Sequence, residues 1–216
     1  MPPAPFATPL WTSARRCINT AMRKPYKRNP GYTPRIDNNG VHRGWGWFVV
    51  PDWNITIAAP PKVGSSALKQ FFHMNEMDDV RMVKRYDVNP NADIYFVVRH
   101  PHDRFASLWK SKCRDKANIL DKRVHGMTPD ELMAHIEAGN KDVHWTPQTT
   151  LLGDFNATLI PLEQLGDWFR DRNYGELGVF NDTKGVIPLS EELHVKICNF
   201  YAEDFLLYAR ALKLTS

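Results

Sequence analysis

The sequence has few cysteines, no long apolar run and little net charge. Its three cysteines, Cys17, Cys113 and Cys198, form no C-x-x-C pair, so neither a disulfide framework nor a zinc site is expected. No apolar run reaches the roughly 20 residues that span a bilayer, and the first residues lack the apolar stretch of a signal peptide, so we expect a cytoplasmic protein without a membrane anchor. A net charge of +4 is too small to indicate nucleic-acid binding, although it suits a small anionic ligand.

The composition changes near residue 40. Residues 1–40 are rich in proline and basic residues with few apolar positions, which predicts a loose arm. A solvated tail is the favoured interpretation of this arm, and a substrate-contacting segment is the alternative. Residues 41–216 have the length and apolar content of one folded domain.

Strand and helix patterns alternate along residues 41–216. The apolar run Ile94–Val98 is typical of a strand buried on both faces of a parallel sheet. Thr128 and Glu131 predict a capping box, and Ser190 predicts the cap of a final helix. The alternation predicts an α/β fold, a P-loop-like three-layer domain with a central, mainly parallel sheet flanked by helices. The predicted strands are 47–50, 55–59, 94–98 and 157–160, the predicted helices begin near 65, 101, 129, 162 and 191, and 144–155 is predicted to be a loop.

The segment PKVGSS at residues 61–66 lies between a predicted strand and a predicted helix. Gly64 would let the backbone approach a phosphate, Ser65 and Ser66 would add donors at the helix N-terminus, and Lys62 would add a mobile positive charge. The ATP-binding pattern G-x-x-x-x-G-K-[ST] places its lysine after the second glycine, whereas Lys62 precedes Gly64. The segment therefore predicts an anion-binding loop of a different kind.

A second anion-binding segment, VVRHPHDRFAS, follows the predicted strand 94–98. Arg99 offers a planar fork that suits phosphate oxygens. In the predicted helix from Pro101, Phe105, Leu108, Trp109 and Cys113 form the apolar stripe. Asp103, Ser107, Lys110 and Arg114 fall on the other side, where a ligand could reach Ser107. A purely structural alternative for Arg99 is an ion pair with Asp103.

Together the two segments resemble the sulfotransferases that use 3′-phosphoadenosine 5′-phosphosulfate (PAPS), whose 5′-phosphosulfate loop reads P-K-x-G-[ST]-[ST] and whose 3′-phosphate is bound by an arginine and a serine eight positions later. The pattern R-x-P-x-x-R-x-x-S, with HWTPQ and FYAEDFLLY further on, is most similar to the Golgi carbohydrate sulfotransferases. This chain departs from them in lacking their membrane anchor, in being shorter, and in having Ser65-Ser66 where threonine is common.

The resemblance implies PAPS as donor and 3′,5′-phosphoadenosine (PAP) as product. It implies that Lys62 contacts the bridging oxygen and the 5′-phosphate, and that Arg99 and Ser107 bind the 3′-phosphate. A turn in NDTKG could close over that phosphate, although a surface turn is the plainer interpretation. The residues expected to bind the donor are Lys62, Val63, Gly64, Ser65, Ser66, Arg99, Ser107, Lys184 and Gly185.

We expect in-line transfer to an acceptor hydroxyl, assisted by a general base. No metal ion is expected, because the sulfuryl group carries only one negative charge and needs less neutralisation than a phosphoryl group. His144, in the H-W-x-P segment, is the preferred base, together with Lys62 as the other catalytic residue. A buried structural histidine is an equal alternative for His144. The other candidates for the base are His73, His100, His102, Glu76, Asp78 and Asp79.

The acceptor is expected to be a carbohydrate hydroxyl, with a small metabolite, a lipid or a protein tyrosine as alternatives. The oligomeric state is left open. Two rival functions are an ATP-dependent kinase of P-loop type, against which the order of lysine and glycine argues, and a non-catalytic module that binds anions.

Overall fold

The computed structural model describes residues 46–77, 79–83, 88–89, 92–114, 123–178 and 189–213. The chain divides into two units, Met1–Thr33 and Pro34–Ser216, and every described residue belongs to the second. The predicted arm at residues 1–40, together with Asp78, Lys184 and Gly185, lies outside the described residues. Among the described helices, none is long and apolar enough to cross a membrane.

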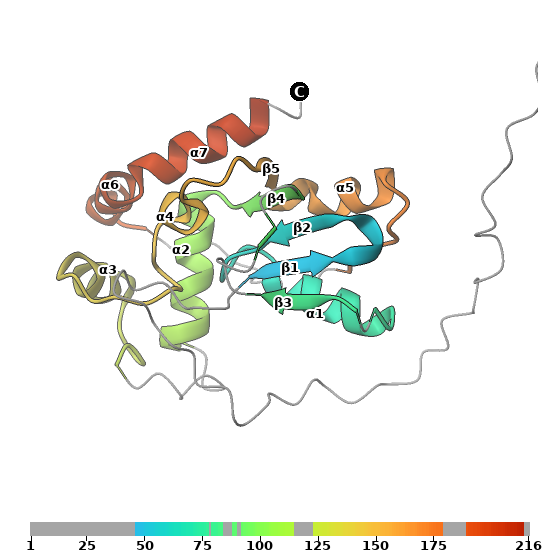
Figure 1. Ribbon diagram of the computed structural model, residues 1–216. Helices are drawn as coiled ribbons and strands as arrows, with labels where there is room; N and C mark the ends of the chain where they lie inside the picture. Colours follow the sequence, from blue (N-terminus) through green and yellow to red (C-terminus); the bar gives the residue numbers. More distant parts are fainter. Residues whose placement is uncertain are drawn as a thin grey trace, which may run out of the picture. The chain divides into compact units, whose positions relative to one another are not determined.

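A five-stranded sheet forms the centre of the described domain (Figure 1). Strands β2 and β4 are parallel neighbours, as are β4 and β5, whereas β1 runs antiparallel to both β2 and β3. In the described sheet β1 is thus the one strand that opposes the rest, and the predicted mainly parallel sheet is confirmed. The strands are β1 Trp47–Val50, β2 Ile55–Ala58, β3 Arg81–Val83, β4 Asp93–Val98 and β5 Thr158–Pro161, in the order β3-β1-β2-β4-β5.

Helices α3 and α6 begin at the caps that the sequence predicts. The Thr128 side chain accepts from the Glu131 N–H and the Glu131 carboxylate accepts from the Thr128 N–H, which confirms the predicted capping box. Ser190 Oγ accepts from the Leu193 N–H at 3.1 Å. The helices are α1 Ser65–Met74, α2 Pro101–Trp109, α3 Pro129–Glu137, α4 Gln148–Leu152, α5 Leu165–Asp171, α6 Glu191–Phe200 and α7 Ala202–Lys213, and a π-helical turn, Lys110–Arg114, continues α2.

Helices cover both faces of the sheet. Leu68 of α1 and Phe169 of α5 pack in one core with Ile57 of β2. Leu151 of α4 and Leu207 of α7 pack in another with sheet residues that include Phe96 of β4. Helices α2, α3 and α6 share a third core beside these two. The three-layer α/β architecture is confirmed.

The structure differs from the sequence prediction in three elements. Strand β3 was not predicted, because it has three residues, two of them exposed. The loop predicted at 144–155 is wrong, because it contains helix α4. The single helix predicted after Ser190 is also wrong, since Tyr201 leaves the helical conformation, with φ −105° and ψ 26°, and separates α6 from α7.

Candidate functional site

The carboxyl ends of β2, β4 and β5 meet at one edge of the sheet, because these strands are parallel neighbours. The segment from Pro60 to Gly64 follows β2, Arg99 follows β4, and Leu162 follows β5. Ligands of open α/β sheets bind at this edge, outside the strand ends. Both predicted anion-binding segments therefore lie where such a fold binds its ligand.

The backbone of the loop after β2 is tightly constrained. Gly64 has a φ of 93°, a left-handed conformation that strains any residue with a side chain, and a Cβ atom there would also lie 2.8 Å from Leu162 Cδ1, so the position favours glycine. Lys62 also has a positive φ, 72°, which typically costs a residue with a side chain about 1–2 kcal/mol. Backbone strain of this kind is concentrated at functional sites. The loop then enters α1, where the Leu68 N–H donates to the Gly64 carbonyl at 3.0 Å.

The two anion-binding segments are in direct contact. Arg99 Nη1 donates to the Lys62 carbonyl oxygen at 3.1 Å. The Arg99 backbone is fixed from the other side, because its N–H donates to Gln148 Oε1 and its carbonyl accepts from Gln148 Nε2, both at 2.9 Å. Gln148 is fully buried at the start of α4. The Arg99 guanidinium and the loop at residues 60–64, which we call the lysine loop, thus belong to one site.

Arg104 joins three segments around this site. It is buried, and its Nε donates to the Pro61 carbonyl at 3.4 Å while its Nη2 donates to the His144 carbonyl at 3.3 Å. Its Nη1 lies 4.0 Å from a carboxylate oxygen of Asp204, which is also buried. Ser107 lies three residues further along α2, so it neighbours Arg104 on the helix.

His144 is held by the carboxylate of Asp142. Its Nδ1 lies 2.5 Å from Asp142 Oδ1, which also accepts from the His144 backbone N–H at 2.9 Å. Burial lowers the pKa of His144 to about 4, with the charges of Lys112 and Lys62 acting in the same direction and the bond to Asp142 opposing them. Burial alone would raise the pKa of Asp142, but the hydrogen bonds from His144 outweigh it and keep the carboxyl ionised.

These contacts determine the tautomer of His144. An ionised Asp142 accepts the proton on Nδ1, so the neutral ring carries its lone pair on Nε2. Arg104 donates both to the Pro61 carbonyl and to the His144 carbonyl, so it links the His144 segment to the lysine loop. The arrangement can bind an anion and accept a proton beside it, which is what transfer of an anionic group to a hydroxyl requires.

A sequence model of the sulfotransferase family matches residues 45–166, which are 122 of the chain's 216 residues. The chain belongs to the sulfotransferase family. The matched range of this sulfotransferase contains the lysine loop, Arg99, Arg104, Ser107 and the Asp142–His144 pair. No curated protein and no solved structure shows significant similarity to it.

The structure places the predicted donor-binding residues of this sulfotransferase unequally. Lys62 and Gly64 are half-buried, Ser66 is exposed, and Ser65 is buried at the start of α1. The Val63 side chain is fully buried in the core shared by α1 and α5. The structure brings Lys62, Arg99 and His144 together through the contacts above.

The polar side of α2 is more buried than the helical pattern indicates. Ser107 and Lys110 lie on that side and are only 5% and 3% exposed, whereas Asp103 and Arg114 are exposed. The reason is that the face away from the apolar stripe is itself covered in the domain, where Arg104 makes its buried contacts. No hydrogen bond supports the alternative pairing of Arg99 with Asp103 in the described structure, where Arg99 contacts Lys62 instead.

The other candidate bases are placed differently from His144. The His100 ring packs against Phe205 and Tyr208 of α7, and the His102 ring packs against His194 of α6, so both turn towards the C-terminal helices. His73 is exposed near the end of α1, and Glu76 and Asp79 are exposed after it.

Four residues that build the site were not assigned by sequence reasoning. Asp142 stands two residues before His144, a spacing that could have indicated a carboxylate–imidazole pair. The other three belong to the motifs HWTPQ (Gln148), R-x-P-x-x-R (Arg104) and Y-x-x-D-F (Asp204), but the motifs alone gave them no role. Their contacts join segments that are distant in the sequence, so only the fold reveals them.

Proposed function

We propose that the protein transfers a sulfuryl group from PAPS to an acceptor hydroxyl, with a carbohydrate as the first candidate. The observation that carries this proposal is the 3.1 Å hydrogen bond from Arg99 to the Lys62 carbonyl. It joins a loop suited to a phosphosulfate with an arginine suited to the 3′-phosphate of the same nucleotide. A donor with anionic groups at two positions matches this pair of cationic side chains.

Each residue of the site has its own role in the proposed transfer step. In the proposed step the acceptor oxygen forms a bond to sulfur, the bond from sulfur to the bridging oxygen breaks, and PAP leaves with that electron pair. Lys62 stabilises the charge that develops on the bridging oxygen, and the N-terminus of α1 with Ser65 and Ser66 donates to the sulfuryl oxygens. His144 Nε2 accepts the proton of the hydroxyl, while Asp142 holds the ring in the required tautomer.

The proposal includes further contacts with the 3′-phosphate and a reaction without metal. Ser107 would share the 3′-phosphate with Arg99, and Lys184 and Gly185 would close over it. The reaction would need no metal ion, since Lys62 and the amides of the loop supply the positive charge. The resemblance to the Golgi carbohydrate sulfotransferases supports a carbohydrate acceptor, and the lack of a long apolar run supports a cytoplasmic location.

Two rival functions are less well supported. A P-loop kinase would need its lysine after the second glycine of the loop, and the chain belongs to a different transferase family. A non-catalytic anion-binding module has no use for a buried carboxylate that orients an imidazole beside the anion site.

Thermal unfolding with PAP, and separately with ATP and magnesium, tests which nucleotide binds. We expect PAP to raise Tm and ATP with magnesium to have little effect.

Transfer from labelled PAPS to a panel of hydroxyl compounds then tests catalysis. Lys62→Ala should reduce transfer about 10²–10³-fold, the cost of removing one transition-state donor.

Lys213→Ala, which removes an exposed lysine at the end of α7, is the matched control and should leave transfer unchanged. A rise in Tm with ATP and magnesium but none with PAP would refute the donor assignment. PAP binding without transfer to any class of acceptor would favour the non-catalytic module.

A further inference from the structure

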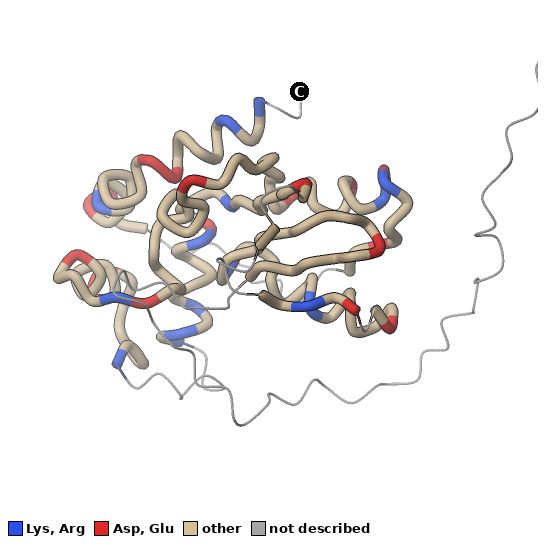
Figure 2. Tube along the Cα trace, viewed as in Figure 1, with Lys and Arg blue, Asp and Glu red and all other residues tan. Residues whose placement is uncertain are grey.

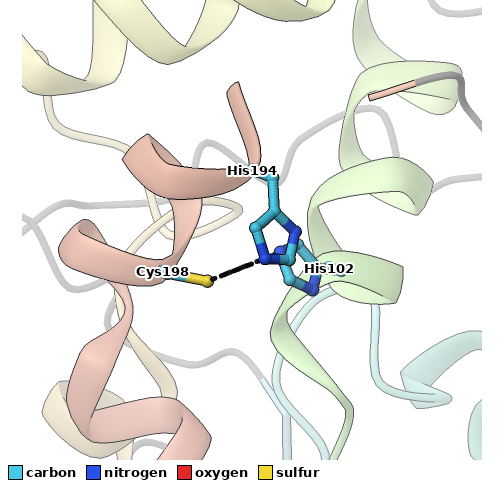
Figure 3. Close-up of side chains that lie close together, drawn as sticks. All are labelled: His102, His194 and Cys198. Atoms are coloured by element: carbon cyan, nitrogen blue, oxygen red, sulfur yellow. Dashed lines mark hydrogen bonds between the residues drawn. The ribbon is translucent and has the colours of Figure 1, made fainter. Parts of the chain in front are cut away.

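Two histidines and a cysteine converge between α2 and α6, apart from the residues assigned to transfer (Figure 3). His102 comes from the first turn of α2, and His194 and Cys198 come from successive turns of α6. Because His194 and Cys198 are four residues apart, they lie on the same helical face. Their ligating atoms all lie within 4.8 Å of one another, and we call these three residues the α2–α6 cluster.

The distances in the cluster match the ligand shell of zinc. Zinc binds imidazole nitrogen at about 2.0–2.1 Å and thiolate sulfur at about 2.3 Å, so two such ligands at tetrahedral angles lie about 3.6 Å apart. Cys198 Sγ lies 3.6 Å from His194 Nε2 and 3.9 Å from His102 Nε2. Both separations are close to one edge of a zinc tetrahedron.

The nitrogen atoms of the cluster are those that usually bind metals. Both histidines present Nε2 to the sulfur, and their rings stack with centroids 4.4 Å apart and planes 19° apart. His194 is exposed and can turn its ring towards a shared ion.

We propose that His102, His194 and Cys198 bind one Zn²⁺ ion that links α2 to α6. The histidines bind through Nε2 and Cys198 binds as the thiolate, releasing its proton on binding. Water fills the fourth position. Three ligands from two helices fit a soft, tetrahedral site, since thiolate and imidazole favour zinc over calcium or magnesium.

The sequence gives little sign of such a site, because His102 and the other two ligands are separated by about 90 residues and no C-x-x-C pair is present. The site is independent of sulfuryl transfer. Zinc would hold the start of α2, which directly follows Arg99, against α6, and its effect would be on stability rather than on the reaction.

Titration of the metal-free protein, without an affinity tag, with Zn²⁺ tests this proposal. We expect one equivalent to bind and to raise Tm, because an ion that binds only the folded state stabilises it. Titration with Co²⁺ gives a spectroscopic signature, since a thiolate ligand produces a charge-transfer band in the near ultraviolet. Cys198→Ser should abolish that band, and each of His102→Gln and His194→Gln should weaken Zn²⁺ binding by more than about tenfold, the lower end of what loss of a supporting residue costs.

Two variants serve as controls. His125→Gln changes an exposed histidine outside the cluster, and Cys17→Ser changes another cysteine, so both should bind Zn²⁺ and Co²⁺ as the unaltered protein does. Absence of stoichiometric Zn²⁺ binding would overturn the proposal. So would binding that survives Cys198→Ser with the Co²⁺ band intact, because the ligands would then lie elsewhere.

Discussion

The side chain of His144 combines two properties that a general base needs. Asp142 fixes the proton on Nδ1 and leaves the lone pair on Nε2, while burial and the charges of Lys112 and Lys62 keep the ring neutral. A neutral ring is available to accept a proton over a wider acidic range than an ordinary histidine. The same shift lowers its proton affinity, so close placement of the hydroxyl must compensate.

We expect kcat/KM for PAPS to remain high well below pH 6.5 and to fall only as the pH approaches about 4, because the pKa of His144 in the protein without ligand is lowered to about 4. A pH profile of initial rates measures this.

His144→Ala should remove turnover while PAP still raises Tm. Unchanged kcat in that variant would eliminate His144 as the base.

Asp142→Asn tests the tautomer. An amide can donate to Nδ1 and move the ring proton to Nε2, so we expect kcat to fall by about 10²–10⁴ with little change in PAP binding. Arg123→Gln is the control, since Arg123 donates at 3.0 Å to Asp142 Oδ2, whereas the ring of His144 contacts Oδ1. An equal loss in both variants would indicate a structural role for the carboxylate.

At the scale of elements, a buried carboxylate of α7 holds α4 in place. Asp204 accepts from the backbone N–H groups of Gln148 and Thr149 at 2.7 and 2.9 Å. Tyr201 adds a second tie, because its hydroxyl donates to the Trp145 carbonyl at 2.9 Å. Since Gln148 in turn holds the Arg99 backbone, helix α7 positions the arginine from a distance.

Asp204→Asn should therefore weaken both the fold and the site. Asparagine supplies one acceptor oxygen in place of two and removes the charge that faces Arg104, so we expect unfolding free energy to drop by about 3–5 kcal/mol. Chemical denaturation measures the loss, and PAP binding should weaken in the same variant. Glu203→Gln, the exposed neighbour, should change neither.

These contacts also show what sequence reasoning could and could not reach. Four of the five described strands and most helices follow from local patterns, such as the run Ile94–Val98 and the cap at Thr128, because each pattern reflects the burial or hydrogen bonding of its own residues. Helix α4 is five residues long and depends on Asp204, about 55 residues away, so no local pattern indicates it. Lys62 and Arg99 were predicted from motifs, whereas their direct contact required the fold.

At the scale of the whole molecule, acidic and basic residues are scattered along the described helices, strands and loops (Figure 2). The pH dependence of stability should then come mainly from buried groups. His144 has a lower pKa in the folded protein than the ordinary 6.5, so the folded state binds fewer protons and is most stable above that pH. Its contribution is lost as the pH falls from 6.5 towards 4.

We expect the unfolding free energy to drop by about 2 kcal/mol between pH 8 and pH 5 on account of this residue. Urea denaturation at both pH values measures it. His144→Gln cannot take up the proton and should lose about 2 kcal/mol less over the same interval. His125→Gln, an exposed change, should behave like the unaltered protein. An identical pH dependence in all three proteins would show that His144 is not buried as a neutral ring.

The tie between Asp204 and α4 has a consequence for biosynthesis. The ribosome synthesises the lysine loop and Arg99 long before Asp204 of α7. The main chain of Arg99 is held by Gln148, and the helix that contains Gln148 is held by the carboxylate of Asp204. The nascent chain can form the parallel strands early. Nucleotide affinity should then appear only after the last helix has emerged from the exit tunnel.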